Sequence, residues 1–163
     1  MVQVEHTFAL FEAGYGIMNE HQVAIGESTC AAKLWAAPTT AGGKAMIEAR
    51  ELTRIALERS RTAREAVETM GALAEKYGFY AADWSGGDDS KGEGGEALTV
   101  VDPDEAWVFH VLSDDLGTGA VWAAQRLADD HVSPGPPPHT FLTYSCRPLA
   151  GAGTSTAAAA AGQ

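Results

Sequence analysis

Residues 97–112 read Ala-Leu-Thr-Val-Val-Asp-Pro-Asp-Glu-Ala-Trp-Val-Phe-His-Val-Leu, two apolar runs on either side of an Asp-Pro-Asp turn signal. Proline presets the backbone dihedral of a turn, and aspartate accepts hydrogen bonds from nearby backbone amides, so the stretch predicts antiparallel strands at 97–101 and 106–112. The second run is apolar on both faces, which is typical of a central, covered strand. A third run at 120–124 follows a turn signal at 114–117. We therefore expect a three-stranded meander.

The first half of the chain predicts further strands and two helices. Residues 8–30 combine apolar positions with glycines, and Asn19-Glu20-His21 predicts the turn between two strands. Helical spacing of apolar residues predicts one helix at 44–59 and a second that opens with a Thr62/Glu65 capping box and stops at Gly78. Strands, then helices, then strands predict an α+β layered sandwich and not a doubly wound sheet.

Composition narrows the class of protein. The chain has 163 residues with 22 acidic and 11 basic side chains, a formal net charge of −11, which argues against nucleic acid and anionic lipid as partners. No apolar run approaches the ~20 residues that span a bilayer, and residues 1–6 lack the features of a signal peptide. We expect no membrane partner and favour a cytoplasmic location. Two widely spaced cysteines, Cys30 and Cys146, predict free thiols.

The composition changes along the chain. Residues 83–130 hold 12 acidic and 2 basic side chains, and we expect residues 85–95 to be flexible. From residue 131 onward there is no acidic residue, and five of the seven prolines lie there with an alanine run at 157–161. Such a segment has little to bury. We expect a partial folded domain over residues 1–132 and a disordered tail over 133–163.

Local patterns name no enzyme by themselves. Cys30 follows Ser28 and Thr29, but no cationic side chain nearby in sequence lowers its pKa, so a structural thiol is favoured over a nucleophile working with His21 or His110. His110 lies among apolar residues and is interpreted as a hydrogen-bonded core histidine. The acidic run at 83–92 lacks the closing ligand of a calcium loop. We expect no metal and no cofactor.

Three segments together resemble the secernin/dipeptidase family of cysteine peptidases: Gly-Tyr-Gly-Ile-Met-Asn-Glu-His-Gln-Val-Ala-Ile-Gly-Glu-Ser-Thr-Cys at 14–30, Gly-Gly-Glu-Ala-Leu-Thr-Val-Val-Asp-Pro-Asp-Glu-Ala-Trp at 94–107, and 118–126. The resemblance extends over roughly residues 6–132. It implies the αββα sandwich of the N-terminal nucleophile hydrolases and hydrolysis of dipeptides. In that mechanism a cysteine at the mature amino terminus attacks, and its own α-amine, with a reference pKa of ~7.7–8.0, accepts the proton.

The resemblance also implies roles for particular residues. The chain begins Met1-Val2 and its first cysteine is Cys30, so we expect the terminal nucleophile to be absent, the chain to be a truncated member and the chain as given to be inactive. Thr29 stands about where related bile-salt hydrolases carry an asparagine that stabilises the oxyanion. Glu27 and Ser28 beside it are expected to contact substrate. Asn19 and Glu20 match a family motif, and we expect them to close the strand turn.

An alternative interpretation is a non-catalytic binding or assembly module derived from the same fold. Its acidic surface and exposed sheet edges would pair with another chain, including a second copy of itself. A dipeptide-hydrolysis assay and size-exclusion chromatography distinguish the two functions.

Overall fold

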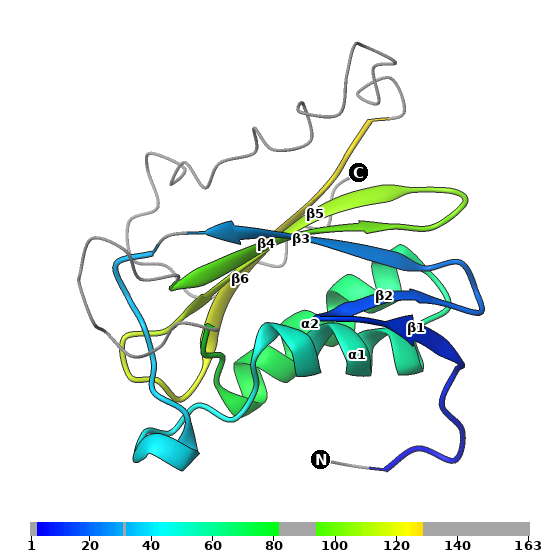
Figure 1. Cartoon of the computed structure of the whole chain (residues 1–163). Helices are drawn as coiled ribbons and strands as arrows, with labels where there is room; N and C mark the ends of the chain where they lie inside the picture. The colour runs from blue at the N-terminus through cyan, green and yellow to red at the C-terminus, as the bar shows by residue number, and fades with distance from the viewer. Residues whose placement is uncertain (1–2, 31, 82–93, 129–163) are drawn as a thin grey trace.

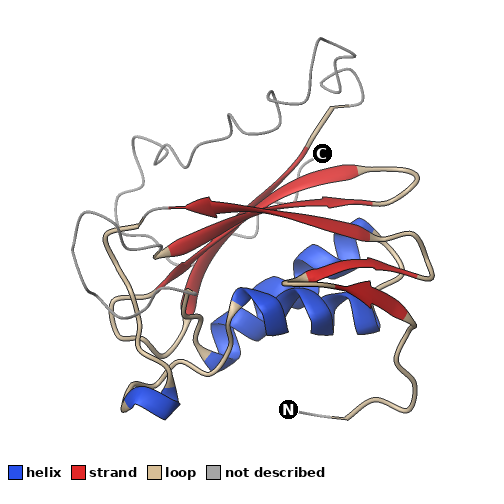
Figure 2. Cartoon of the chain, viewed as in Figure 1, coloured by secondary structure: helices blue, strands red, loops and turns tan. Residues whose placement is uncertain are grey.

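The computed structural model describes residues 3–30, 32–81 and 94–128, which form one antiparallel sheet with two α-helices on one side of it (Figures 1 and 2). The six strands lie in the order β1-β2-β3-β4-β5-β6, so each strand pairs with its neighbour in sequence. The fold class is therefore α+β. The strands are β1 (Leu10–Glu12), β2 (Gly16–Asn19), β3 (Ala24–Cys30), β4 (Gly95–Val101), β5 (Ala106–Ser113) and β6 (Ala120–Arg126).

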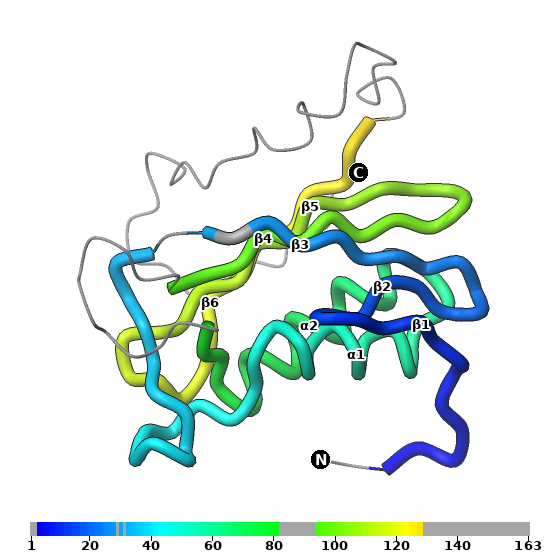
Figure 3. Tube along the Cα trace, viewed as in Figure 1, coloured from blue at the N-terminus to red at the C-terminus, as the bar shows by residue number. Residues whose placement is uncertain are grey.

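The predicted meander is confirmed as β4, β5 and β6, with bounds that differ from the prediction by two residues at most. In β5, Trp107, Phe109 and Val111 point into the core under the helices. The strand is central within the meander, as expected, but in the whole sheet it lies next to the end strand β6. Figure 3 shows the trace running from β4 through β5 to β6 at the end of the sheet opposite β1.

The turn predicted at 19–21 is also confirmed, since β2 ends at Asn19 and β3 begins at Ala24. Gln22 adopts a positive φ of 64° there, which lets the chain reverse within a short turn. β3 then pairs with β4 along its whole length, from Ala24 opposite Val101 to Cys30 opposite Gly95. This pairing joins the N-terminal hairpin to the meander in one sheet.

The first helix, α1 (Ala49–Arg59), begins five residues later than predicted. The residues before it are extended and form parallel bridges with other segments of the same chain. Ala45 pairs with Pro38, and Ile47 pairs with Phe79. A short 3₁₀ turn, η1 (Thr39–Ala41), precedes them. The apolar spacing that suggested helix at 44–48 therefore serves extended pairing, because Ile47 reaches the core from there.

The second helix, α2 (Ala63–Tyr77), begins and ends as predicted. Thr62 Oγ1 accepts a hydrogen bond from the Glu65 amide at 3.1 Å. The Glu65 carboxylate accepts in return from the Arg61 amide at 2.7 Å, one residue earlier than in the usual capping box. Gly78 ends the helix at φ 70°, ψ 130°, a conformation that glycine adopts without a steric penalty.

The core lies between the two helices and the sheet. Its largest fully buried side chains include Phe79, Phe109, Leu52, Leu57 and Met70. On the β6 side, Trp122 packs so closely over Gly71 of α2 that an added Cβ would lie 2.3 Å from the indole ring. The described residues thus form two layers, one of helices and one of strands. Neither described helix is long and apolar enough to cross a membrane.

Candidate functional site

The sheet has a helix-facing side and an opposite side, and strand register assigns each residue to one of them. Ile25, Val100 and Trp107 lie in one cross-strand row and belong to the core under the helices. Side chains alternate between faces along a strand, so a residue one position away points to the opposite side. We call that opposite side the open face of the described sheet because neither described helix packs on it, although Ala97 and Val108 on this face are only 5% and 8% exposed.

A polar row crosses the open face. Ser28 of β3 pairs with Ala97 of β4, and Ala97 pairs with His110 of β5. Two strand spacings of ~4.8 Å put the Ser28 and His110 backbones roughly 10 Å apart, with the methyl group of Ala97 between them. A hydroxyl and an imidazole on either side of a small residue can contact two polar ends of one short ligand.

His110 is half-buried in this row, and burial lowers its pKa from the ordinary value. Desolvation penalises the charged imidazolium, so His110 is neutral near pH 7. The sequence suggested a core histidine, whereas the register puts its side chain on the face away from the helices. Alternation along 106–112 separates the two faces, but only the pairing with β4 and β3 brings His110 into the row of Ser28.

The predicted substrate-contacting pair does not share a face. Glu27 pairs with Leu98, a fully buried residue of the helix side, whereas Ser28 lies on the open face. Consecutive residues of a regular strand cannot line one pocket from the same side of a sheet. Thr29 pairs with Glu96, which is 1% exposed.

Asn19 is 5% exposed and makes four hydrogen bonds. Its Nδ2 donates to the carbonyls of Leu57 and Ser60, both at 2.8 Å, at the C-terminal end of α1. Its Oδ1 accepts from the amides of His21 and Val23, at 3.0 and 3.1 Å, within its own turn. One side chain therefore ties the β2–β3 turn to a helix end that lies 38 to 41 residues away in sequence.

Glu20 and His21 point to separate neighbours. The Glu20 carboxylate accepts a hydrogen bond from the Ala9 amide at 3.0 Å, and the Glu20 amide donates to the Ala9 carbonyl at 2.9 Å. The His21 ring lies edge-on to Phe8 with 4.3 Å between ring centroids. Both residues thus bind the segment before β1, and the described residues do not bring them together in a group of metal ligands.

The expectation of a free thiol is wrong for Cys30, which is disulfide-bonded and 2% exposed. Its partner lies outside the described residues. The two histidines considered as possible bases for Cys30 are also too far from it. His21 lies near the opposite end of β3, roughly 20 Å away at ~3.3 Å per residue, and His110 lies two strands away in a different row.

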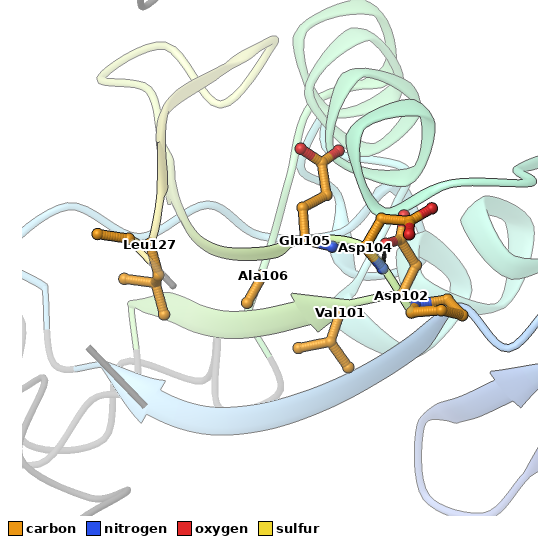
Figure 4. A pocket seen from close by; sticks show the side chains of 8 residues that line it. Val101, Asp102, Asp104, Glu105, Ala106 and Leu127 are labelled. Carbon is orange, nitrogen blue, oxygen red and sulfur yellow. Dashed lines mark hydrogen bonds between the residues drawn. The ribbon is translucent and has the colours of Figure 1, made fainter. Parts of the chain in front are cut away.

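One open pocket of about 300 Å³ lies at the β4–β5 turn (Figure 4). Asp102, Asp104 and Glu105 line it together with apolar residues such as Leu127. Asp102 accepts from the Ala63 amide at 2.6 Å and from the Asp104 and Glu105 amides at 2.8 Å. Partial burial opposes ionisation, but these three amides outweigh it and lower the pKa of Asp102. Its carboxylate holds the turn against α2, and none of the residues expected to form a site lies here.

Several interpretations fall outside the described residues. They are residues 85–93 of the stretch expected to be flexible, the acidic run at 83–92, Cys146, and the tail at 133–163. The expected flexible stretch is wrong at its last residue, because Gly95 begins β4. β1 is a separate strand that the pattern at residues 8–30 did not predict.

The fold and the open face define an α+β domain with a polar cross-strand row on the side away from its helices. The model of peptidase family C69 matches residues 7–138. The chain therefore belongs to peptidase family C69, which includes dipeptidases and secernin, and the suspected resemblance is confirmed. The family implies peptidase activity, that is, hydrolysis of peptide bonds.

Proposed function

We propose that the chain is the scaffold of a cysteine-type dipeptidase that acts on dipeptides or short peptides. The observation that carries this proposal is the family match, which extends over both the N-terminal hairpin and the meander. We propose that residues 1–132 form a partial peptidase domain. The substrate class and the cysteine chemistry come from the family, and we propose the open face as the place where the substrate binds.

The open face is proposed to pack against a second sheet, which would complete the αββα sandwich of the N-terminal nucleophile hydrolases. Apolar side chains on that face support this arrangement. Phe11 pairs with Met18, and Met18 pairs with Ala24 of the open face. Phe11 is 70% exposed and Met18 is 44% exposed. Val121 of β6 is 59% exposed on the same face. Large apolar side chains gathered on one side of a sheet favour a covering layer.

The substrate is proposed to lie along the Ser28–Ala97–His110 row. An extended dipeptide measures roughly 7 Å at ~3.5 Å per residue, which fits between side chains whose backbones are roughly 10 Å apart. The Ser28 hydroxyl can donate to a carboxylate end. A neutral His110 can accept from an ammonium end. Thr29, expected as the oxyanion or pocket residue, pairs with Glu96 at a register position of the opposite face, so it is not proposed as part of this row.

The attacking thiol is proposed to come from a residue other than Cys30. A cysteine nucleophile must be an accessible thiolate with a base in hydrogen-bonding reach. Cys30 is buried and disulfide-bonded, and neither His21 nor His110 is close enough to serve it. In the family mechanism one terminal cysteine supplies both the nucleophile and, through its α-amine, the base.

The test uses the purified 163-residue chain with a panel of dipeptides in the presence of a thiol reductant. We expect no turnover, but saturable dipeptide binding in titration calorimetry. Ser28→Val should weaken binding at least tenfold, whereas Glu27→Gln on the opposite face should leave it unchanged. Turnover that Cys30→Ala abolishes would refute the assignment of the nucleophile. Equal binding by wild type and Ser28→Val would refute the placement of the substrate.

A further inference from the structure

The two end strands of the sheet are built differently. β1 has three residues, carries Glu12, and shifts register against β2 between Phe11 and Glu12. Short length, charge and irregular register are devices that prevent an edge strand from pairing with another chain. β6 has seven residues and pairs with β5 in an unbroken register from Ala120 to Arg126. It contains no proline, and its single charged residue is Arg126.

The side chains of β6 divide between the two faces. Ala120, Trp122 and Ala124 pack against the core, whereas Val121, Ala123 and Gln125 are exposed on the open face. Arg126 Nε lies 3.1 Å from the carboxylate of Glu105, which immediately precedes β5. In the described part of the chain, no strand pairs with the outer side of β6. The edge is therefore long, regular, weakly charged and backed by a packed helix.

We infer that β6 pairs antiparallel with β6 of a second copy of this chain, about a two-fold axis at Ala123. This register pairs all seven residues. Trp122 then lies opposite Ala124 of the other copy, and Val121 opposite Gln125, so core-side and open-face positions match. The two copies of Arg126 lie at opposite ends of the contact, about 20 Å apart at ~3.4 Å per residue, so no like charges meet.

The contact continues the sheet at its edge and does not involve the open face. It is therefore independent of the proposed dipeptidase function. The acidic chain, with a net charge of −11, repels its own copies at long range, which favours a site where few acidic residues lie. β6 contains no acidic residue.

Sedimentation equilibrium of the full chain, from micromolar to about 100 µM, tests the inference. Wild type should form a dimer in this range. Ala123→Lys places two like-charged side chains directly opposite each other on the axis, with Cβ atoms about 5 Å apart, and should weaken the dimer at least tenfold. Gln125→Lys is the matched control, because the new lysine faces Val121 of the other copy and meets no like charge. Both positions are exposed, and circular dichroism checks that both variants fold.

Cysteine cross-linking tests the register separately. Ala123→Cys should form a symmetric intermolecular disulfide under mild oxidation, since directly opposed residues lie within disulfide range. Val121→Cys and Gln125→Cys should cross-link when mixed but not singly, and wild type reports the background from its own cysteines. A monomer at 100 µM, equal dissociation of the two lysine variants, or cross-linking of Val121→Cys alone would overturn the proposal.

Discussion

Replacing Asn19 with alanine should destabilise the fold more than any other single polar change in the β2–β3 turn. The truncation leaves the carbonyls of Leu57 and Ser60 and the amides of His21 and Val23 without their partner. Three of these bonds are buried and one is partly buried. At roughly 1 kcal/mol for each lost bond, Asn19→Ala should lower the free energy of unfolding by about 3–4 kcal/mol.

Urea unfolding followed by tryptophan fluorescence measures this loss. The midpoint should fall while the slope m stays constant, and the melting temperature should drop by about 10–15 °C. Glu20→Ala is the matched control in the same turn. Its carboxylate makes an exposed bond to the Ala9 amide, so its removal should cost about 0.5 kcal/mol.

Asn19→Asp separates hydrogen bonding from packing, because the side chains have the same shape. At neutral pH a carboxylate oxygen would face the carbonyls of Leu57 and Ser60, which are 2.8 Å from Nδ2 in the native protein. The variant should be as unstable as Asn19→Ala at pH 7 and recover as the pH falls toward the carboxyl pKa, since the protonated acid can donate one bond. A loss below about 1 kcal/mol for Asn19→Ala, equal to the Glu20→Ala control, would refute the reasoning.

Two further predictions concern the core and the open face. Gly71→Ala places a Cβ 2.3 Å from the Trp122 ring and should cost about 1–3 kcal/mol in urea unfolding, whereas Gly26→Ala, with no atom within 4 Å, should cost less than 1; equal losses would contradict the close contact between α2 and β6. Burial lowers the pKa of His110 below 6.5, so the folded state binds fewer protons than the unfolded one. Stability should be complete above about pH 6.5 and decline as the pH falls through the lower folded value. His110→Gln should remove this part of the decline between pH 7.5 and 5, and identical pH profiles for the two proteins would speak against it.

The residues that share the candidate site could not be predicted from the sequence. Glu27, Ser28 and Thr29 are adjacent in the chain, and adjacency suggested one shared pocket. Strand alternation places Glu27 and Ser28 on opposite faces, and this follows once 24–30 is known to be regular strand. His110, two strands across the sheet from Ser28, lies 82 positions later in the chain. No local pattern connects the two.

The start of α1 is also set by contacts between segments that are distant in the sequence. Residues 44–48 have helical spacing of apolar side chains, yet they lie before the first turn of α1. Ile47 instead forms a bridge with Phe79, which follows α2 in the sequence. The Thr62/Glu65 cap and the Gly78 stop were predictable, since each acts within four residues of itself. Tertiary contacts overrule a local preference wherever burial of a large side chain is at stake.

The amino-acid order alone determined the turns at 19–21 and 102–104, the second helix, the meander and the family, because each depends on interactions between residues close together in the chain or on a long ordered pattern. The tertiary structure decided the row of Ser28 and His110, the anchoring of Asn19 to the end of α1, and the edge of β6 with which no described strand pairs. These depend on which strands become neighbours and in what register, and that choice is made by burial of the common core and not by any single segment.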